Sequence, residues 1–198
     1  MTKQEFLRLA HLYPVAAALK SDRDRQIALD SDAQLLFLLK GDAFQLEPFV
    51  AQVHRRKKGI VVHVDLVSGI GKDRAGIQFL HQIGVDAIIT SRSQLVHAGR
   101  AEGLLTIQRL LLVDDSALET GARTIVRAMP DFVEVLPGII FPEVALALQQ
   151  LLAGPFIAGG FIRTKADIAR IQSAGAILSS SSTYELWYRD GQQKKSEL

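Results

Sequence analysis

The sequence of 198 residues contains no cysteine, one tryptophan and six prolines. Without a thiol, the chain cannot form a disulfide, a thiolate nucleophile or a cysteine-ligated zinc site. An excess of charge is missing too, because 23 lysines and arginines against 21 acidic residues leave a formal net charge of +2. This balance gives no support to nucleic-acid binding over the whole surface of the protein.

Long hydrophobic runs are also missing. The N-terminal stretch MTKQEFLRLAHLYPVAA is interrupted by Arg8, His11 and Pro14, and no apolar run approaches the roughly 20 residues that a membrane-spanning helix needs. The N-terminus shows no signal-peptide pattern. We therefore expect a soluble, cytoplasmic protein with no membrane partner, and the hydrophobic content of 48% indicates a globular fold.

Short apolar runs are what the sequence has in quantity. Each is of strand length, and most are apolar on both faces, which is typical of parallel strands covered by helices. The eight runs are PVAAAL (14–19), QLLFLL (34–39), IVVHVDL (60–66), DAIITS (86–91), LLTIQRLLLV (104–113), DFVEVLP (131–137), PFIAGGF (155–161) and AILSSS (176–181).

Between these runs, apolar residues recur at helical spacing, as in Ala75, Phe79 and Ile83. Eight strands alternating with about eight helices predict a compact (β/α)₈ barrel with a closed parallel sheet, although such barrels are typically about 250 residues long. An open doubly wound sheet of fewer strands is the alternative. We expect a single domain over residues 1–198, with an ordered core at about 12–189 and a polar tail at 190–198.

Polar side chains fall near the ends of several runs, and function in a parallel barrel gathers at the carboxyl ends of the strands. His63 and Asp65, for example, share one face of the third run by the two-residue period of a strand. Such groups are costly to bury unless they pair or meet a ligand. A buried ion-pair network or exposure at the rim is the structural alternative to a binding site. The predicted ligand-binding residues are His63, Asp65, Arg92, Gln108 and Glu134.

The stretch FIAGGFIRT, residues 156–164, spends two glycines at a strand end, where glycine is costly. Glycine lets the backbone approach a phosphate closely, and the loops after strands seven and eight of such barrels often bind one. A serine run follows the eighth strand and precedes a short helix predicted at 183–189, which Ser181 or Ser182 would cap. The sequence leaves open whether Arg163 neutralises the phosphate or faces solvent. The predicted phosphate-binding residues are Gly159, Gly160, Ser180 and Ser181.

The basic run RRKK is predicted to end a helix, where cations complement the helix dipole. Contact with a polyanion is the other interpretation of Arg55, Arg56, Lys57 and Lys58. No histidine set has the spacing of metal ligands, and no Gly-x-Ser-x-Gly or Walker motif is present. The sequence therefore predicts no catalytic residue, no metal and no cofactor.

Several stretches together resemble one family. HVDLVSGI (63–70), TSRSQLVHAG (90–99), TIQRLLLVDDSAL (106–118), PDFVEVLPGII (130–140), AGGFIRT (158–164) and AGAILSSSSTYELW (174–187) are similar, in this order, to the bacterial glycerol-uptake operon antiterminator regulatory proteins. The resemblance runs from about Pro14 to Trp187.

The resemblance implies a barrel that senses glycerol 3-phosphate and acts on leader messenger RNA to let transcription pass a terminator. The phosphate would then lie on the glycines and serines above, and the polyol end on the other five predicted residues. RNA contact is assigned to RRKK, and a homo-oligomer is possible. The alternative is an enzyme acting on a small phosphorylated substrate, with Asp65, Lys72 and Glu134 as its acid–base candidates.

Overall fold

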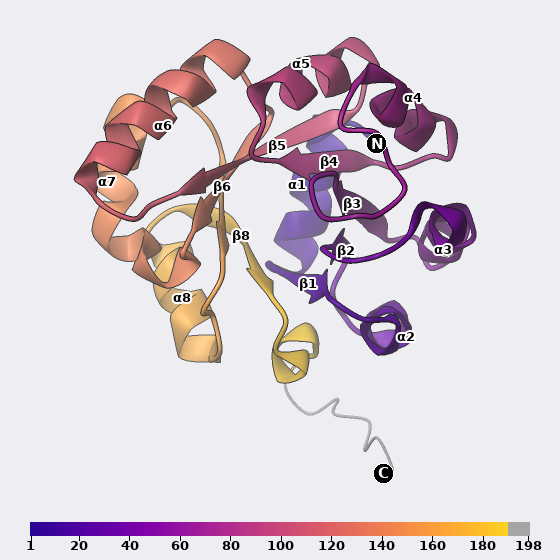
Figure 1. The fold of residues 1–198 in the computed structure, drawn as a ribbon. Coiled ribbons are helices and arrows are strands. Elements are labelled where there is room, and N and C mark those ends of the chain that lie inside the picture. The colour runs from indigo at the N-terminus through magenta and orange to yellow at the C-terminus, as the bar shows by residue number, and fades with distance from the viewer. Residues whose placement is uncertain (190–198) are drawn as a thin grey trace.

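The computed structural model describes residues 1–189 and has the predicted architecture, a closed parallel barrel of eight strands surrounded by helices (Figure 1). Each strand pairs in parallel with the next, and β1 pairs with β8 to close the sheet. The predicted tail at 190–198 lies outside the described residues. The strands are β1 Val15–Leu19, β2 Leu35–Leu38, β3 Gly59–His63, β4 Ala87–Thr90, β5 Leu105–Leu111, β6 Phe132–Leu136, β7 Phe156–Gly159 and β8 Ala176–Ser181.

The helices lie outside the barrel, with one exception. Five of them, α2, α3, α4, α6 and α8, begin after a Ser, Thr or Asp whose side chain accepts a hydrogen bond from the first turn. The helices are α1 Lys3–Leu12, α2 Asp22–Asp30, α3 Ala43–Arg55, α4 Arg74–Gln82, α5 Ser93–Ala101, α6 Asp115–Ala128, α7 Phe141–Leu151 and α8 Lys165–Ser173, with 3₁₀ helices η1 Gly138–Ile140 and η2 Tyr184–Trp187.

The exception is α1, which covers the amino-terminal end of the barrel. Phe6, Leu9 and Ala10 are buried there, and the Phe6 ring lies 4.3 Å from the ring of Phe132 in β6. The packed part of the chain therefore begins before residue 12, where the ordered core was predicted to start. The helical spacing of these three residues gives the segment an apolar face to bury. No helix among the described residues is long and apolar enough to cross a membrane.

The strands are buried on both faces, which explains their continuous apolar character. Every residue of β1, β2, β3 and β4 is buried. Successive side chains alternate between the barrel interior and the layer of helices outside. The interior cluster includes Val61, Ile107 and Phe132, whereas Val62, Leu110 and Val133 pack in the outer cluster. This alternation decides which polar residues face the interior at the carboxyl end.

Candidate functional site

The interior of the barrel changes from apolar to polar near the carboxyl ends of the strands. Val61, Ile107, Phe132 and Leu178 belong to the apolar interior. The residues two positions further along the same strands are His63, Arg109, Glu134 and Ser180. Because the side-chain period of a strand is two, these four point inward as well. The strand register thus gathers a buried polar layer from β3, β5, β6 and β8.

Glu134 lies at the centre of this layer and is 1% exposed. Its Oε2 accepts a hydrogen bond of 2.8 Å from Nε of Arg109, and its Oε1 accepts one of 2.9 Å from the Ser180 hydroxyl. Burial raises the pKa of Glu134, while Arg109 and Ser180 favour the carboxylate and oppose the shift. The carboxylate is therefore a paired group that holds two neighbouring side chains in place.

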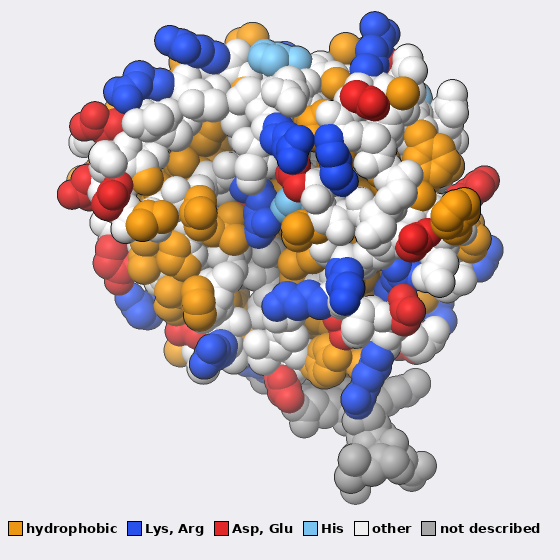
Figure 2. Space-filling view, in the orientation of Figure 1, with side chains coloured by type: hydrophobic (Ala, Val, Ile, Leu, Met, Phe, Trp, Pro, Cys, Tyr) orange, Lys and Arg blue, Asp and Glu red, His pale blue; other side chains and the backbone are white. Residues whose placement is uncertain are grey.

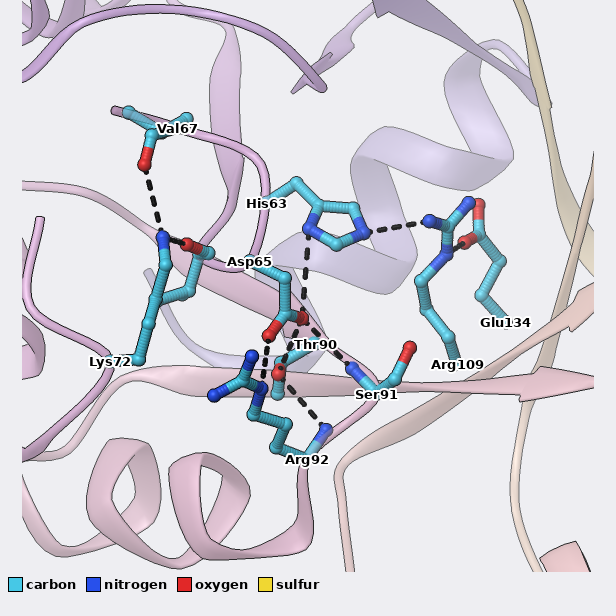
Figure 3. Close-up of polar contacts among 10 residues, drawn as sticks. His63, Asp65, Val67, Lys72, Thr90, Ser91, Arg92, Arg109 and Glu134 are labelled. Atoms are coloured by element: carbon cyan, nitrogen blue, oxygen red, sulfur yellow. Dashed lines mark hydrogen bonds and ion pairs between the residues drawn. The ribbon is translucent and has the colours of Figure 1, made fainter. Parts of the chain in front are cut away.

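Arg109 connects Glu134 to His63. Its Nη1 lies 2.7 Å from Nε2 of His63 (Figure 3). A guanidinium can only donate, so Nε2 must accept and the imidazole is neutral with its proton on Nδ1. Burial, together with the charge of Arg109, lowers the pKa of His63 to about 4. His63 is thus a neutral group at ordinary pH that orients the arginine.

Asp65 continues the polar layer to the rim of the barrel. Its Oδ2 accepts from the Thr90 hydroxyl at 2.8 Å and from the Ser91 backbone N–H at 3.1 Å, and it lies 3.8 Å from Nδ1 of His63. Its Oδ1 lies 3.0 Å from Nε of Arg92, whose side chain is half exposed. The linked groups therefore run from Ser180, through Glu134, Arg109, His63 and Asp65, to Arg92.

Cations dominate this end of the barrel. Lys20 and Lys40 follow β1 and β2, Lys72 lies in the loop after β3, and Arg92 follows β4. Figure 2 shows basic side chains around the centre of this face with little acidic surface between them. Nζ of Lys72 donates to the carbonyls of Val64 and Val67, and burial lowers its pKa. The positive potential suits a small anionic ligand.

Glycine is required at positions 159 and 160, at the end of β7 and in the loop after it, for different structural reasons. A Cβ on Gly159 would lie 2.5 Å from Oε1 of Glu134 and 2.8 Å from Oγ of Ser180. Gly159 therefore makes room for the buried carboxylate, a role that the sequence did not reveal. A Cβ on Gly160 would make ordinary contacts of 3.8–3.9 Å with Leu136 and Pro137, but the φ of Gly160 is 90°, and Phe161 follows with a φ of 60°. Glycine adopts a positive φ without strain, but Phe161, which is 68% exposed, does not, so this loop is strained at Phe161.

Ser180 and Ser181 point to opposite sides of β8. The Ser180 hydroxyl faces the interior and bonds Glu134, whereas the Ser181 hydroxyl donates to the Ile162 carbonyl at 2.8 Å and accepts from the Thr183 N–H. The predicted cap was wrong, because Thr183 is the residue before η2 and its side chain makes no capping bond. The last helix is also shorter than predicted, with four residues at Tyr184–Trp187.

Gln108 is a second correction. Its side chain donates to the Ser93 hydroxyl at the start of α5, at 3.1 Å, and so points away from the barrel interior. The adjacent Arg109 has the opposite orientation and takes the place predicted for Gln108. An alternation count from the buried Ile107 would have found Arg109. The sequence reasoning also missed Lys20, whose Nζ lies 3.1 Å from the Ser182 hydroxyl beside the predicted phosphate position.

The run RRKK lies at the opposite end of the barrel, between the end of α3 and the start of β3. Lys58 is buried, and its Nζ donates to the carbonyls of Ala28, Ser31 and Ala33 at 2.6–2.9 Å. It stabilises the end of α2, so the prediction that Lys58 contacts RNA was wrong. Arg56 pairs with Asp30 at 2.8 Å, while Arg55 and Lys57 are exposed.

Comparison with known proteins agrees with this arrangement. Residues 15–187 match the family described as glycerol-3-phosphate responsive antiterminator. The chain belongs to this family. An uncharacterized Escherichia coli protein, YgcP, is 31% identical over 182 residues, which cover 91% of this chain and 95% of that protein. The resemblance seen in the sequence is confirmed.

Solved structures support the same family and fold. A glycerol uptake operon antiterminator regulatory protein from Listeria monocytogenes superposes with a TM-score of 0.82 at 33% identity, covering 87% of this chain and 94% of that one. An antiterminator-related protein from Thermotoga maritima gives 0.79 at 28% identity, covering 89% and 98%. A deoxyribose phosphate aldolase from Aeropyrum pernix gives 0.70 at 14% identity, covering 94% and 97%, and shows only that the barrel fold is shared.

Proposed function

We propose that this member of the antiterminator family binds glycerol 3-phosphate at the carboxyl end of its barrel and, in response, binds leader messenger RNA of glycerol-uptake genes in the cytoplasm. The observation that carries the ligand proposal is the polar layer from Ser180 to Arg92 within a surface rich in cations. The family description supports the identity of the ligand.

The phosphate is assigned to the side of the barrel formed by β7, β8 and β1. Gly160 there presents its backbone without a Cβ, and Lys20 reaches Ser182 and brings a positive charge to the same place. Backbone N–H groups and a nearby lysine are the groups with which proteins commonly hold phosphate. The proposal rests on Gly160 and Lys20, because the backbones of Ser180 and Ser181 are paired with β1 and β7 in the sheet.

The polyol hydroxyls are assigned to the rim on the opposite side, formed by β3 and β4. The Asp65 carboxylate can accept from a hydroxyl, and the half-exposed Arg92 can donate to one. His63 and Glu134 are too deeply buried to be the first contacts, at 2% and 1% exposed. They act as positioning residues that fix the Arg109 guanidinium between them.

The strained loop after β7 supports a ligand-dependent change in conformation. Gly160 and Phe161 both have positive φ, and a phosphate bound to this loop would stabilise one loop conformation over others. RNA affinity would then follow the population of that conformation. The cations at this end of the barrel supply one surface for RNA phosphates, and the exposed Arg55 and Lys57 at the other end supply a second.

Calorimetry tests the ligand. We expect heat of binding with glycerol 3-phosphate and none with glycerol or inorganic phosphate at the same concentration. Arg92→Ala is expected to weaken binding roughly tenfold, as loss of a charged hydrogen bond predicts. Arg55→Ala, at the opposite end, is the matched control and keeps the affinity of the wild type. The absence of any heat of binding with all three compounds would refute the ligand proposal.

A gel shift tests RNA binding. The wild-type protein is mixed with a terminator-bearing leader RNA at fixed salt, with and without glycerol 3-phosphate. A ligand-dependent shift is expected. No shift in either condition at moderate salt contradicts the regulatory proposal, even where calorimetry shows that the ligand binds.

The alternative, an enzyme acting on a small phosphorylated substrate, has less support. Of its acid–base candidates, Glu134 is tied to Arg109 and Ser180, Asp65 to Arg92 and Thr90, and Lys72 to two backbone carbonyls. Each group is engaged in a structural contact. Turnover of a small sugar phosphate by the purified protein would favour the enzyme instead.

A further inference from the structure

Exposed hydrophobic side chains are concentrated on one side of this molecule. The described residues expose ten large apolar side chains, and seven of them fall between positions 111 and 161. This segment forms β5 to β7 with helices α6 and α7, and Figure 2 shows an apolar area on the same side of the barrel rim. The seven are Leu111, Val113, Val126, Met129, Leu146, Leu151 and Phe161. Scattered apolar residues are ordinary, but their concentration on one side is typical of an interaction surface.

Helices α6 and α7 lie side by side there (Figure 1), and a groove of about 370 Å³ runs between them. Val126 of α6 and Leu151 of α7 line the groove and are 58% and 44% exposed. Met129, 61% exposed, lines a second hollow of about 260 Å³ at the end of α6. Covering this face would bury apolar surface that now meets water.

The charged side chains of α6 indicate which partner covers the face between α6 and α7. Asp115, Glu119, Arg123 and Arg127 follow one another at intervals of four, so they form one ridge along the helix. The first two are acidic and the last two are basic. A second copy of α6 in antiparallel orientation, centred between Glu119 and Arg123, would place Asp115 opposite Arg127 and Glu119 opposite Arg123, each pair occurring twice.

The same pattern argues against RNA as the occupant, because Asp115 and Glu119 would repel its phosphates. Within one chain, Glu119 and Arg123 are 3.9 Å apart and 72% and 65% exposed. This loose pair is worth little by itself and is free to exchange for intermolecular contacts. We propose that the α6–α7 face, formed by Val126, Met129 and Leu151 with this charged ridge, is a two-fold interface with a second copy of the chain.

Molar mass in solution tests the proposal. Light scattering coupled to gel filtration, over a range of protein concentrations, is expected to give a dimer for the wild type. Val126→Glu, which buries a charge in the interface, is expected to give a monomer. Phe44→Glu is the control, because Phe44 is 92% exposed and lies outside this face, so that variant stays dimeric. A monomeric wild type at the highest soluble concentration, or a dimer that survives Val126→Glu, overturns the proposal.

Charge reversal tests the antiparallel arrangement directly. Glu119→Arg and Arg123→Glu each place like charges opposite one another and are expected to weaken the dimer roughly tenfold. The double variant restores opposite charges at both positions and should regain most of the wild-type affinity. A double variant that dimerises as weakly as either single variant refutes the antiparallel arrangement. A variant that loses leader-RNA binding without any change in molar mass would show that RNA, and not a second copy of the chain, occupies this face. Circular dichroism of each variant verifies that the monomer remains folded.

Discussion

The Arg109 guanidinium lies 2.8 Å from the carboxylate of Glu134 inside the barrel, on the neighbouring strands β5 and β6. Because Glu134 is 1% exposed, removing its partner leaves a charge without compensation. Arg109→Met is therefore expected to lower the free energy of unfolding by about 3–5 kcal/mol, measured by urea denaturation at pH 7. Changing Glu134 to Met in the same chain should recover much of this loss.

The pH dependence of that variant gives an independent control. Burial raises the pKa of Glu134, and loss of Arg109 raises it further, so the folded state binds more protons than the unfolded state above the unfolded pKa of about 4.3. Stability then falls as pH rises through this range, and the deficit of Arg109→Met should be smaller at pH 5 than at pH 7. Equal deficits at both values would contradict an uncompensated carboxylate.

His63 predicts a loss of stability in acid. Its pKa is lowered from 6.5 to about 4, so between these values the unfolded state binds more protons than the folded state. Stability from the neutral imidazole is therefore fully present above about pH 6.5 and is lost as pH falls toward 4, by roughly 3 kcal/mol. His63→Gln keeps an acceptor for Arg109 without titrating, and its urea midpoint should depend less on pH than that of the wild type. His97→Gln, an exposed site, should leave the wild-type slope unchanged.

Substitutions at the two adjacent glycines are expected to destabilise the fold for different reasons. Gly159→Ala brings a methyl group to 2.5 Å from Glu134 and is expected to destabilise the fold by about 1–3 kcal/mol through overpacking. A Cβ at Gly160 would make only ordinary contacts, but the φ of 90° strains a β-branched residue, so Gly160→Val is expected to cost a similar amount. Only Gly160→Asn should escape most of this cost, because Asn tolerates positive φ. Thermal unfolding measures all three, and calorimetry of Gly160→Val should show no binding of glycerol 3-phosphate.

Substitutions of Lys58 and Arg55 compare the contribution of a buried cation to stability with that of an exposed one. Lys58→Met removes three hydrogen bonds to carbonyls and should cost about 2–4 kcal/mol in urea unfolding. Arg55→Ala is expected to change stability by less than about 0.5 kcal/mol, as surface substitutions usually do. A Lys58→Met protein of normal stability would show that the buried lysine has no such role.

The sequence was sufficient for the strands because each apolar run is buried on both faces and is flanked by polar residues. The sequence was insufficient to predict which of Gln108 and Arg109 faces the barrel interior. Their run, LLTIQRLLLV, is apolar before and after them, so composition does not say which one faces inward. The choice depends on the pairing of Arg109 with Glu134 across β5 and β6. Functional side chains near strand ends could thus be predicted as a group, but their orientation requires a register.

Lys58 was misassigned for a related reason. The RRKK pattern is local, whereas the carbonyls of Ala28, Ser31 and Ala33 that bind Lys58 come from about 25 to 30 residues earlier in the chain. The need for glycine at position 159 likewise comes from the Glu134 carboxylate, whose Oε1 would lie 2.5 Å from a Cβ there. Both cases depend on contacts between elements distant in sequence, which composition and spacing do not encode.

Helix α1 has a kinetic consequence for any ligand of this barrel. With Phe6 packed on Phe132, helix α1 covers the amino-terminal end, so we expect a ligand bound at the carboxyl end to enter and leave past Arg92, Lys20 and the Phe161 loop. A macromolecule bound over this end of the barrel would slow the escape of the ligand beneath it. Residence time, and not only affinity, would then decide how long the protein holds its signal.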